Sequence, residues 1–292
     1  MINTERGLLD FTISRLPILP REKIYLSKVF EREGDISVLA KKDIESMLKR
    51  TIRVRDISMK DIQAQGEADW NNAKKHGIGV VAWYEDSYPP LLKEICDPPV
   101  LLYYRGALPK GSDDTIAVVG TRRPSPSGNS DAYNLCRTLA RAGTVVVSGL
   151  ALGIDAMAHR GSVDQGGVTV AVLGSGVDSI YPSSNRGLAR RILEKGGAII
   201  SEYAPFTPPD KWHFPARNRI ISGLCRAVVI VEAPRNSGAL ITARFALEQD
   251  RDLYITRPGL SSPLGEGIRD LEVQGAPVLE NASSLIRSTY VR

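Results

Sequence analysis

A short basic and aromatic stretch in the second half of the chain has residue types suited to binding an anion. It spans Pro208–Leu224 and has the sequence KWHFPARNR over Lys211–Arg219, just before the apolar pair Ile220 and Ile221. Lysine and arginine contact phosphate oxygens, and aromatic faces suit unpaired bases. Because an apolar helix would gain little from these residues, the stretch predicts a phosphate-binding junction between a loop and a helix.

The positive charge of the chain gathers around this stretch. Between Arg186 and Arg226 lie eight Lys or Arg residues and three Asp or Glu residues, and this surplus of five equals the net charge of +5 of the whole chain. A local excess of one sign is typical of a binding surface more than of general solubility. The window therefore predicts a basic surface for an anionic partner.

Composition limits the class of protein. The chain has 292 residues, of which 42% are hydrophobic and 24% charged, as in a globular protein of one large and one small domain. No apolar run is long enough to span a bilayer, and the N-terminus lacks a signal-peptide layout, so we expect a cytoplasmic protein without membrane contact. The three cysteines are too few and too far apart for a disulfide framework or a zinc site.

Short apolar runs alternate with helix-length segments after Gly111, which predicts an α/β fold. Such runs, separated by helices, are typical of a parallel sheet covered on both faces, here an extended Rossmann-like sheet. The predicted strands are Ile116–Val119, Thr144–Val147, Val168–Leu173, Ala198–Ile200, Ala227–Val231 and Leu253–Ile255. The predicted helices between them are Gly128–Ala142, Ile154–Gln165, Asn185–Lys195, Ala216–Leu224 and Leu240–Gln249. Two earlier runs, Gly79–Trp83 and Val100–Tyr104, are predicted strands of a leader segment.

Residues 1–65 predict a small all-helical domain ahead of the sheet. Its apolar spacing indicates short helices at Arg21–Glu33, Ile36–Leu48 and Ile57–Gln65. The arrangement resembles helix-hairpin-helix modules, but the turn Pro17–Pro20 has no glycine, which backbone contact with phosphate requires. A packing or partner-binding role is therefore favoured over a DNA contact.

Glycines and hydroxyl residues follow several of the predicted strands. Glycine allows close approach of a ligand to the backbone, and the start of the next helix offers free N–H groups to an anion. Because the carboxyl ends of parallel strands share one edge, these residues predict a phosphate pocket there. The glycines and hydroxyl residues are Gly120, Thr121, Ser148, Gly149, Gly174, Ser237 and Gly238. Arg122 and Arg123, which follow Thr121, are predicted to line the same pocket.

The basic stretch should form one wall of this pocket. Lys211 and Arg217 are the favoured phosphate contacts, because Arg217 stands at a helix start, where a cation is unfavourable unless an anion shares the site. Asn218 and Arg219 are further candidates, but residues two apart on a helix point in different directions. Arg219 could therefore brace a neighbouring turn instead.

Catalytic signals are weak. The chain has no P-loop, and Gly174-Ser175-Gly176 lacks the third glycine of a dinucleotide-binding motif. Asp155 and His159 lie four residues apart on a predicted helix, but a metal would need a third ligand. The sequence therefore predicts no enzyme, no cofactor and no metal.

The motifs together resemble the DNA-processing protein A (DprA/Smf) family. The resemblance covers about residues 68–276. It rests on the segments Val118–Arg123, Ser148–Asp155 with His159, Ala171–Gly176, Tyr181-Pro182 with Asn185, Ser201–Tyr203, Phe214–Ile221, Val231–Ala233 and Ser237–Ala243.

The resemblance implies an extended Rossmann-like DNA-binding domain over residues 66–292, behind the helical domain. It implies a homodimer that binds and protects single-stranded DNA and helps to load RecA recombinase during natural transformation. By position, Arg122 or Arg123 and Lys211 would contact DNA. The alternative is a nucleotide-processing, phosphoribohydrolase-like enzyme, which resembles this chain in fold but carries a P-G-G-x-G-T pattern where this chain has Pro234–Ala239.

Overall fold

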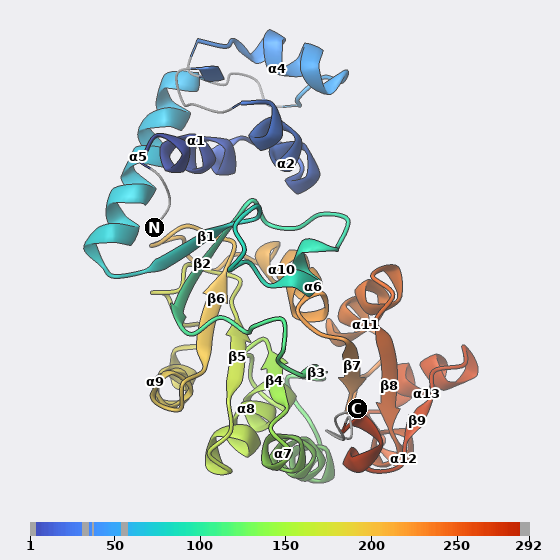
Figure 1. Ribbon diagram of the computed structural model, residues 1–292. Helices are drawn as coiled ribbons and strands as arrows, with labels where there is room; N and C mark the ends of the chain where they lie inside the picture. The colour runs from blue at the N-terminus through green and yellow to red at the C-terminus, as the bar shows by residue number, and fades with distance from the viewer. Residues whose placement is uncertain (1–3, 31–34, 37, 54–57, 287–292) are drawn as a thin grey trace, which may run out of the picture.

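A nine-stranded sheet forms the body of the protein, with a group of short helices beyond one of its edges (Figure 1). The computed structural model describes residues 4–30, 35–36, 38–53 and 58–286. The strands are β1 (Gly79–Ala82), β2 (Leu101–Gly106), β3 (Thr115–Val119), β4 (Val145–Ser148), β5 (Thr169–Val172), β6 (Ala198–Ser201), β7 (Ala227–Ile230), β8 (Asp252–Thr256) and β9 (Val278–Leu279). Their order across the sheet is β1-β2-β6-β5-β4-β3-β7-β8-β9.

The predicted α/β architecture is confirmed, with one correction at the edge. Seven neighbouring strands, β6-β5-β4-β3-β7-β8-β9, pair in parallel. The pairs β1 with β2 and β2 with β6 are antiparallel. The two runs predicted as a leader are therefore edge strands of the same sheet, which is mixed rather than wholly parallel. An apolar run reveals a strand but not its partner, because pairing depends on residues far away in sequence.

Helices cover both faces of the sheet. The helices that follow the N-terminal group are α6 (Pro90–Lys93), α7 (Pro126–Arg141), α8 (Ile154–Asp164), α9 (Arg186–Glu194), α10 (His213–Gly223), α11 (Ala239–Glu248), α12 (Arg257–Ser261) and α13 (Glu266–Val273), with short 3₁₀ turns at Ser183–Asn185 and Ala282–Leu285. Alternate strand residues divide between two cores. Ala117 and Val119 pack with α10 and α11, while Ile116 and Val118 pack with α7 and α8.

The N-terminal helices are α1 (Thr4–Arg15), α2 (Pro20–Val29), α4 (Lys41–Leu48) and α5 (Met59–Lys75). The predicted domain boundary between residues 65 and 66 lies inside α5, which continues without a break toward β1. Phe11 of α1 is fully buried, with its ring centroid 5.8 Å from that of Tyr103 in β2. The helical module thus shares part of its core with the sheet. The end of the predicted helix Arg21–Glu33 and the Gly34 that follows it lie outside the described residues.

The chain reverses direction across the sheet at β3. From β3 it proceeds outward through β4, β5 and β6, and then returns to place β7 on the other side of β3. In open α/β sheets, ligands bind at such a point, outside the carboxyl ends of the strands. None of the described helices is both long and apolar enough to cross a membrane.

Candidate functional site

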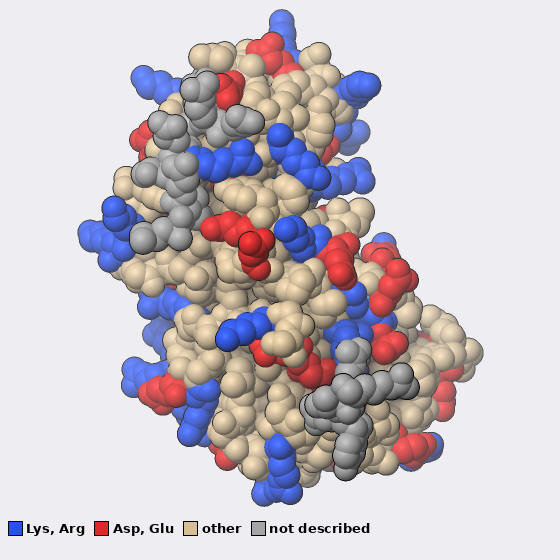
Figure 2. All heavy atoms as spheres, viewed as in Figure 1, with Lys and Arg blue, Asp and Glu red and all other residues tan. Residues whose placement is uncertain are grey.

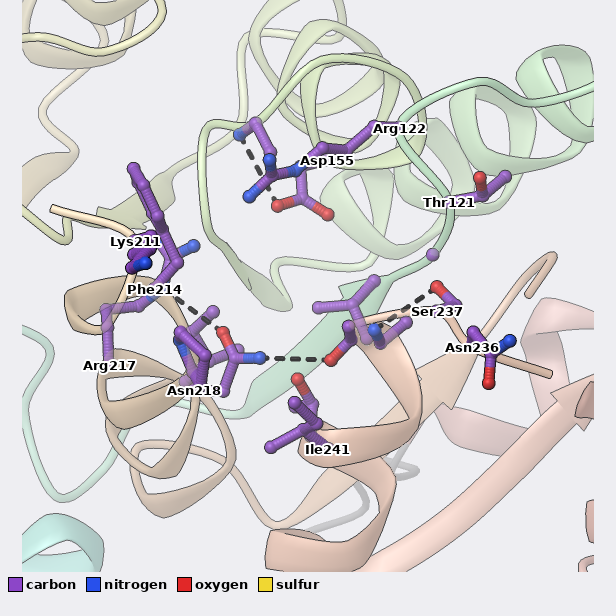
Figure 3. A pocket seen from close by; sticks show the side chains of 18 of the residues that line it. Thr121, Arg122, Asp155, Lys211, Phe214, Arg217, Asn218, Asn236, Ser237 and Ile241 are labelled. Atoms are coloured by element: carbon purple, nitrogen blue, oxygen red, sulfur yellow. Dashed lines mark hydrogen bonds between the residues drawn. The ribbon is translucent and has the colours of Figure 1, made fainter. Parts of the chain in front are cut away.

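A cavity of about 790 Å³ opens at the carboxyl ends of β3 and β7, and we call it the edge cavity. Its walls include the loop from β3 to α7, the loop from β4 into the start of α8, the start of α10, and the start of α11 (Figure 3). Its lining includes Gly120, Thr121, Arg122, Ala151, Asp155, Tyr181, Lys211, Phe214, Arg217, Asn218, Asn236, Ser237, Gly238 and Ile241. The cavity therefore forms at the point of strand reversal and brings distant sequence motifs together.

Two cations at the edge cavity remain free to bind an anion. The side chains of Arg122 and Lys211 are exposed, and neither forms an ion pair among the described residues. The Arg122 guanidinium lies 5.2 Å from the ring centroid of Phe214, and the Lys211 ammonium lies 5.0 Å from that of Trp212. These contacts orient both cations without neutralising them.

Two helices begin at the same cavity. The N-cap residues are Trp212 for α10 and Gly238 for α11, and neither helix start receives a hydrogen bond from its N-cap side chain. A Cβ atom at Gly238 would have no heavy atom within 4 Å, so this backbone faces open space. Helix N-termini carry partial positive charge, which adds to that of the two cations. The electrostatics of the cavity entrance therefore favour an anionic group.

Arg217, predicted as a phosphate contact, lines the edge cavity, but most of it is buried and bonded to the backbone. Only 4% of it is exposed, and its guanidinium donates hydrogen bonds to the carbonyl oxygens of Gly149, at 2.8 Å, and Val172. Burial lowers its pKa to about 10, although the charge of Asp155 opposes this shift. Since Arg217 already satisfies two backbone carbonyls, it fixes the cavity floor. Its position at a helix start did not reveal this, because the helix enters the sheet edge there.

Asp155 is the one acidic residue among those lining the cavity. Its carboxylate accepts hydrogen bonds from the backbone N–H groups of Gly149 and Ala151, at 3.2 and 3.4 Å. Burial raises its pKa, and the charge of Arg217 opposes the increase. His159 lies in the interior, where its Nδ1 is 2.8 Å from the hydroxyl of Thr169. Asp155 thus holds the turn after β4, and His159 contacts Thr169 at the start of β5. Among the described residues, no group of three potential metal ligands occurs.

Arg219 faces away from the cavity. It is 3% exposed and forms a bidentate pair with Glu202, with both nitrogen–oxygen distances 2.6 Å, and a further pair with Asp97 at 3.1 Å. The alternative that Arg219 braces a neighbouring turn thus agrees with the geometry. Arg217 and Arg219 are two positions apart on α10, and this spacing points their side chains into different surroundings.

The other predicted residues divide between the cavity wall and the layer beneath it. Gly120, Thr121, Asn218, Ser237 and Gly238 line the cavity, and the Asn218 side chain donates to the Gly238 carbonyl at 3.1 Å. Arg123 is exposed but does not line the cavity.

Ser148, Gly149 and Gly174 lie beneath the cavity. The Ser148 hydroxyl is buried and donates to the Val118 carbonyl at 2.7 Å, and a Cβ at Gly149 would come within 2.5 Å of Arg217. A Cβ at Gly174 would come within 2.9 Å of the Phe214 ring. These residues therefore shape the floor through close packing.

The basic window does not form one surface. Of its eight cations, Arg217 and Arg219 are buried and Arg226 is paired with Asp114. The four cations from Arg186 to Lys195 belong to α9 and its end, and none of them lines the cavity. Figure 2 shows Lys and Arg interspersed with Asp and Glu on the face in view. Only Lys211 brings the predicted excess charge to the cavity as a free cation, because sequence proximity does not fix side-chain direction.

The sequence interpretation missed Asn236 and Ile241, which line the cavity beside Ser237 and Gly238. Asn236 is exposed, and 37% of Ile241 is exposed. Their place next to a glycine at a helix start was the available signal, because residues in the first turn of such a helix face the same edge.

Comparisons with known proteins place the chain in a family. Residues 79–289 match the family described as DNA recombination-mediator protein A. The chain is 40% identical over 215 residues to the DNA processing protein DprA of Bacillus subtilis, covering 73% of this chain and 71% of that protein. It is 33% identical over 288 residues to protein Smf of Escherichia coli, covering 99% of this chain and 75% of that protein.

Two solved structures resemble this protein in both fold and sequence. DNA processing protein A from Streptococcus pneumoniae matches with a TM-score of 0.76 and 31% identity, covering 99% of this chain and 96% of that one. DNA processing protein A from Helicobacter pylori, in a structure concerned with its single-stranded DNA binding mode, matches with a TM-score of 0.63 and 29% identity, covering 72% and 94%. With its motifs, its fold and these relatives in agreement, the chain belongs to the DNA recombination-mediator protein A family.

Proposed function

We propose that this protein binds single-stranded DNA at the edge cavity without catalysing a reaction. The observation that carries the proposal is the pair of free cations, Arg122 and Lys211, at one cavity where two helices also begin. The single-stranded DNA binding described for the Helicobacter pylori relative supports it.

Phosphate and base would use different parts of the cavity. Arg122 and Lys211 would contact backbone phosphates, which supply most of the affinity of a protein for DNA. Tyr181 and Trp212 are 50% and 70% exposed, so their rings are available to stack on bases. Unpaired bases present their faces for stacking and paired bases do not, which favours a single strand over a duplex.

The rival function, a nucleotide-processing enzyme, has less support from the geometry. Such an enzyme needs an acid or base that can reach its substrate. Among the described residues, the one carboxylate that lines the cavity is that of Asp155, which is buried and accepts two backbone hydrogen bonds. Incubation of the protein with AMP and other nucleotides should release no free base, and release at enzymatic rates would establish the rival.

The family membership also motivates three wider proposals. The protein forms a homodimer, acts in the cytoplasm, and helps RecA recombinase to assemble on single strands during DNA uptake. Analytical ultracentrifugation tests the dimer. RecA-dependent ATP hydrolysis on strands coated with a single-strand-binding protein, with and without this protein, tests the loading step.

The binding proposal is tested with oligonucleotides titrated at several salt concentrations. Lys211→Glu and Arg122→Ala should each weaken single-strand binding by about tenfold or more, because a hydrogen bond to a charged group contributes about 1.5–3 kcal/mol. The log–log salt dependence should become shallower by about 0.7 for each phosphate that the variant no longer neutralises. Fluorescence anisotropy with single- and double-stranded oligonucleotides measures both quantities.

Matched controls are available on exposed helix surfaces away from the cavity. Lys60→Glu, in the first turn of α5, and Arg141→Ala, at the end of α7, change charge in the same way as the two test variants. Both controls should bind like wild type. If the cavity variants also bind like wild type while remaining folded, DNA is not held at this site.

A further inference from the structure

Glu232 is a buried acid at the edge of the sheet. It does not line the edge cavity and is not one of the proposed DNA contacts. It lies two residues after the end of β7 and is 0% exposed. Among the described residues it forms no ion pair. A buried carboxylate without a cation is costly unless hydrogen bonds satisfy it. Its contacts therefore indicate what it does.

Three donors from two different elements converge on the Glu232 carboxylate. Ser125 donates its backbone N–H at 2.8 Å and its hydroxyl at 2.7 Å, and Ser262, which follows α12, donates its hydroxyl. Ser125 is the N-cap of α7, where a negative charge is favourable. A Cβ at Gly128 would lie 2.6 Å from Oε2 of Glu232, so this glycine leaves room for the carboxylate.

The backbone of Glu232 holds the same loop a second time. Its carbonyl oxygen accepts the N–H of Thr121 at 2.7 Å. The loop from Gly120 to Ser125, which carries Arg122, is thus attached to Glu232 near both of its ends. At the base of α8, the Ile154 N–H donates to the Thr121 carbonyl at 3.2 Å and secures the loop from its other side.

Glu232 also connects this loop to the opposite wall of the edge cavity. Asn236, Ser237 and Gly238 follow it by only four to six residues, and they line the cavity across from Arg122. The neighbours of Glu232 are fixed as well, because the Val231 carbonyl accepts the Thr256 hydroxyl at 2.9 Å and the Ala233 carbonyl accepts the Gly267 N–H at 2.9 Å. The segment joins the two walls rigidly.

We propose that Glu232 is a positioning residue for DNA binding, which sets the place of Arg122 relative to the start of α11. The inference rests on the proposed function, because Arg122 is there a phosphate contact. Glu232 acts through the loop and does not touch DNA. A residue that served only to cap α7 would change stability, but its effect on DNA binding would be independent of Arg122.

A double-mutant cycle with Glu232→Ala and Arg122→Ala separates these roles, using affinity for a single-stranded oligonucleotide. Glu232→Ala should weaken binding by nearly as much as Arg122→Ala, and the double variant should bind no more weakly than Arg122→Ala alone. Glu232→Gln should restore affinity close to that of wild type, because the amide can accept from the Ser125 N–H and donate to the two hydroxyls.

Leu139→Ala provides the control for a general decrease in stability. Leu139 is fully buried near the end of α7, the end remote from the loop, so its truncation should lower the melting temperature without changing affinity. If Glu232→Ala does not fold, Glu232→Asp replaces it, since the shorter side chain cannot reach both serines. Every variant is compared by melting temperature as well as by affinity.

The possible outcomes distinguish the two proposals. Wild-type affinity of the folded Glu232 variant, or additive losses in the cycle, would overturn the positioning role while leaving the binding site in place. Wild-type affinity of Arg122→Ala would instead remove the proposed DNA contact itself. Non-additive losses together with rescue by glutamine support the inference.

Discussion

The cations at the edge cavity and the arginines inside α10 differ in their partners, although both come from motifs that looked alike in the sequence. Arg122 and Lys211 are exposed, rest against aromatic rings and have no acidic partner among the described residues. Arg217 and Arg219 are buried, and Arg217 donates to backbone carbonyls while Arg219 pairs with carboxylates. The comparison teaches that a guanidinium binds a ligand only where the fold leaves its donors unused.

This difference predicts two classes of variant. Replacement of a buried arginine should lower stability, whereas replacement of an exposed cation at the edge cavity should lower DNA affinity and leave stability unchanged.

The largest expected effect is on stability, from Arg219→Leu. The change leaves Glu202 and Asp97 without their shared cation, and removal of one partner from a buried pair costs about 3–5 kcal/mol. Urea unfolding followed by circular dichroism measures the decrease. A decrease of only a few tenths of a kcal/mol would show that the pair is as weak as a surface pair.

Arg217→Met should cost less, on the order of 1–3 kcal/mol, because it leaves carbonyls rather than carboxylates unsatisfied. DNA affinity should fall too, since the Gly149 turn beneath the cavity loses its support. The same urea titration and an oligonucleotide titration test both parts. Reduced affinity with unchanged stability would contradict the structural role and point to direct contact with DNA.

The buried His159 should make the stability of the protein depend on pH. Burial lowers the pKa of His159 to about 3, whereas an unfolded histidine has a pKa of about 6.5. Below pH 6.5 the unfolded chain therefore takes up a proton that the folded protein does not, so stability should decrease as the pH falls from about 6.5 toward 3. In melting experiments from pH 7.5 to 5, His159→Gln should flatten this dependence.

The smallest expected effect comes from Arg244→Leu. Arg244 pairs with Glu248 at 2.7 Å on the exposed side of α11, and exposed pairs contribute little to stability because water screens them. Unfolding and DNA binding should both stay close to wild type. A decrease in stability comparable to that of Arg219→Leu would mean that burial does not separate the two classes.

The sequence predicted the repeating strands and helices and the motifs at the sheet edge, because apolar runs and glycine turns are local signals. It placed Arg122, Lys211 and Gly238 at one cavity for the same reason, since the carboxyl ends of parallel strands share an edge. It did not predict that Arg217 turns inward, because helical spacing relates residues to each other but not to the surface that they meet. The antiparallel edge was also hidden, since β1 and β2 reach the sheet only through the distant β6.

Helix α5 has a practical consequence for dividing this protein. Its 17 residues run from the helical module to the strand β1, and its Trp70 ring lies 5.4 Å from that of Phe11. A fragment that starts at residue 66 would cut the helix after its second turn and expose Tyr103 and Trp70 to water. We expect such a fragment to aggregate, whereas one that keeps α1 and all of α5 retains the cover of this edge.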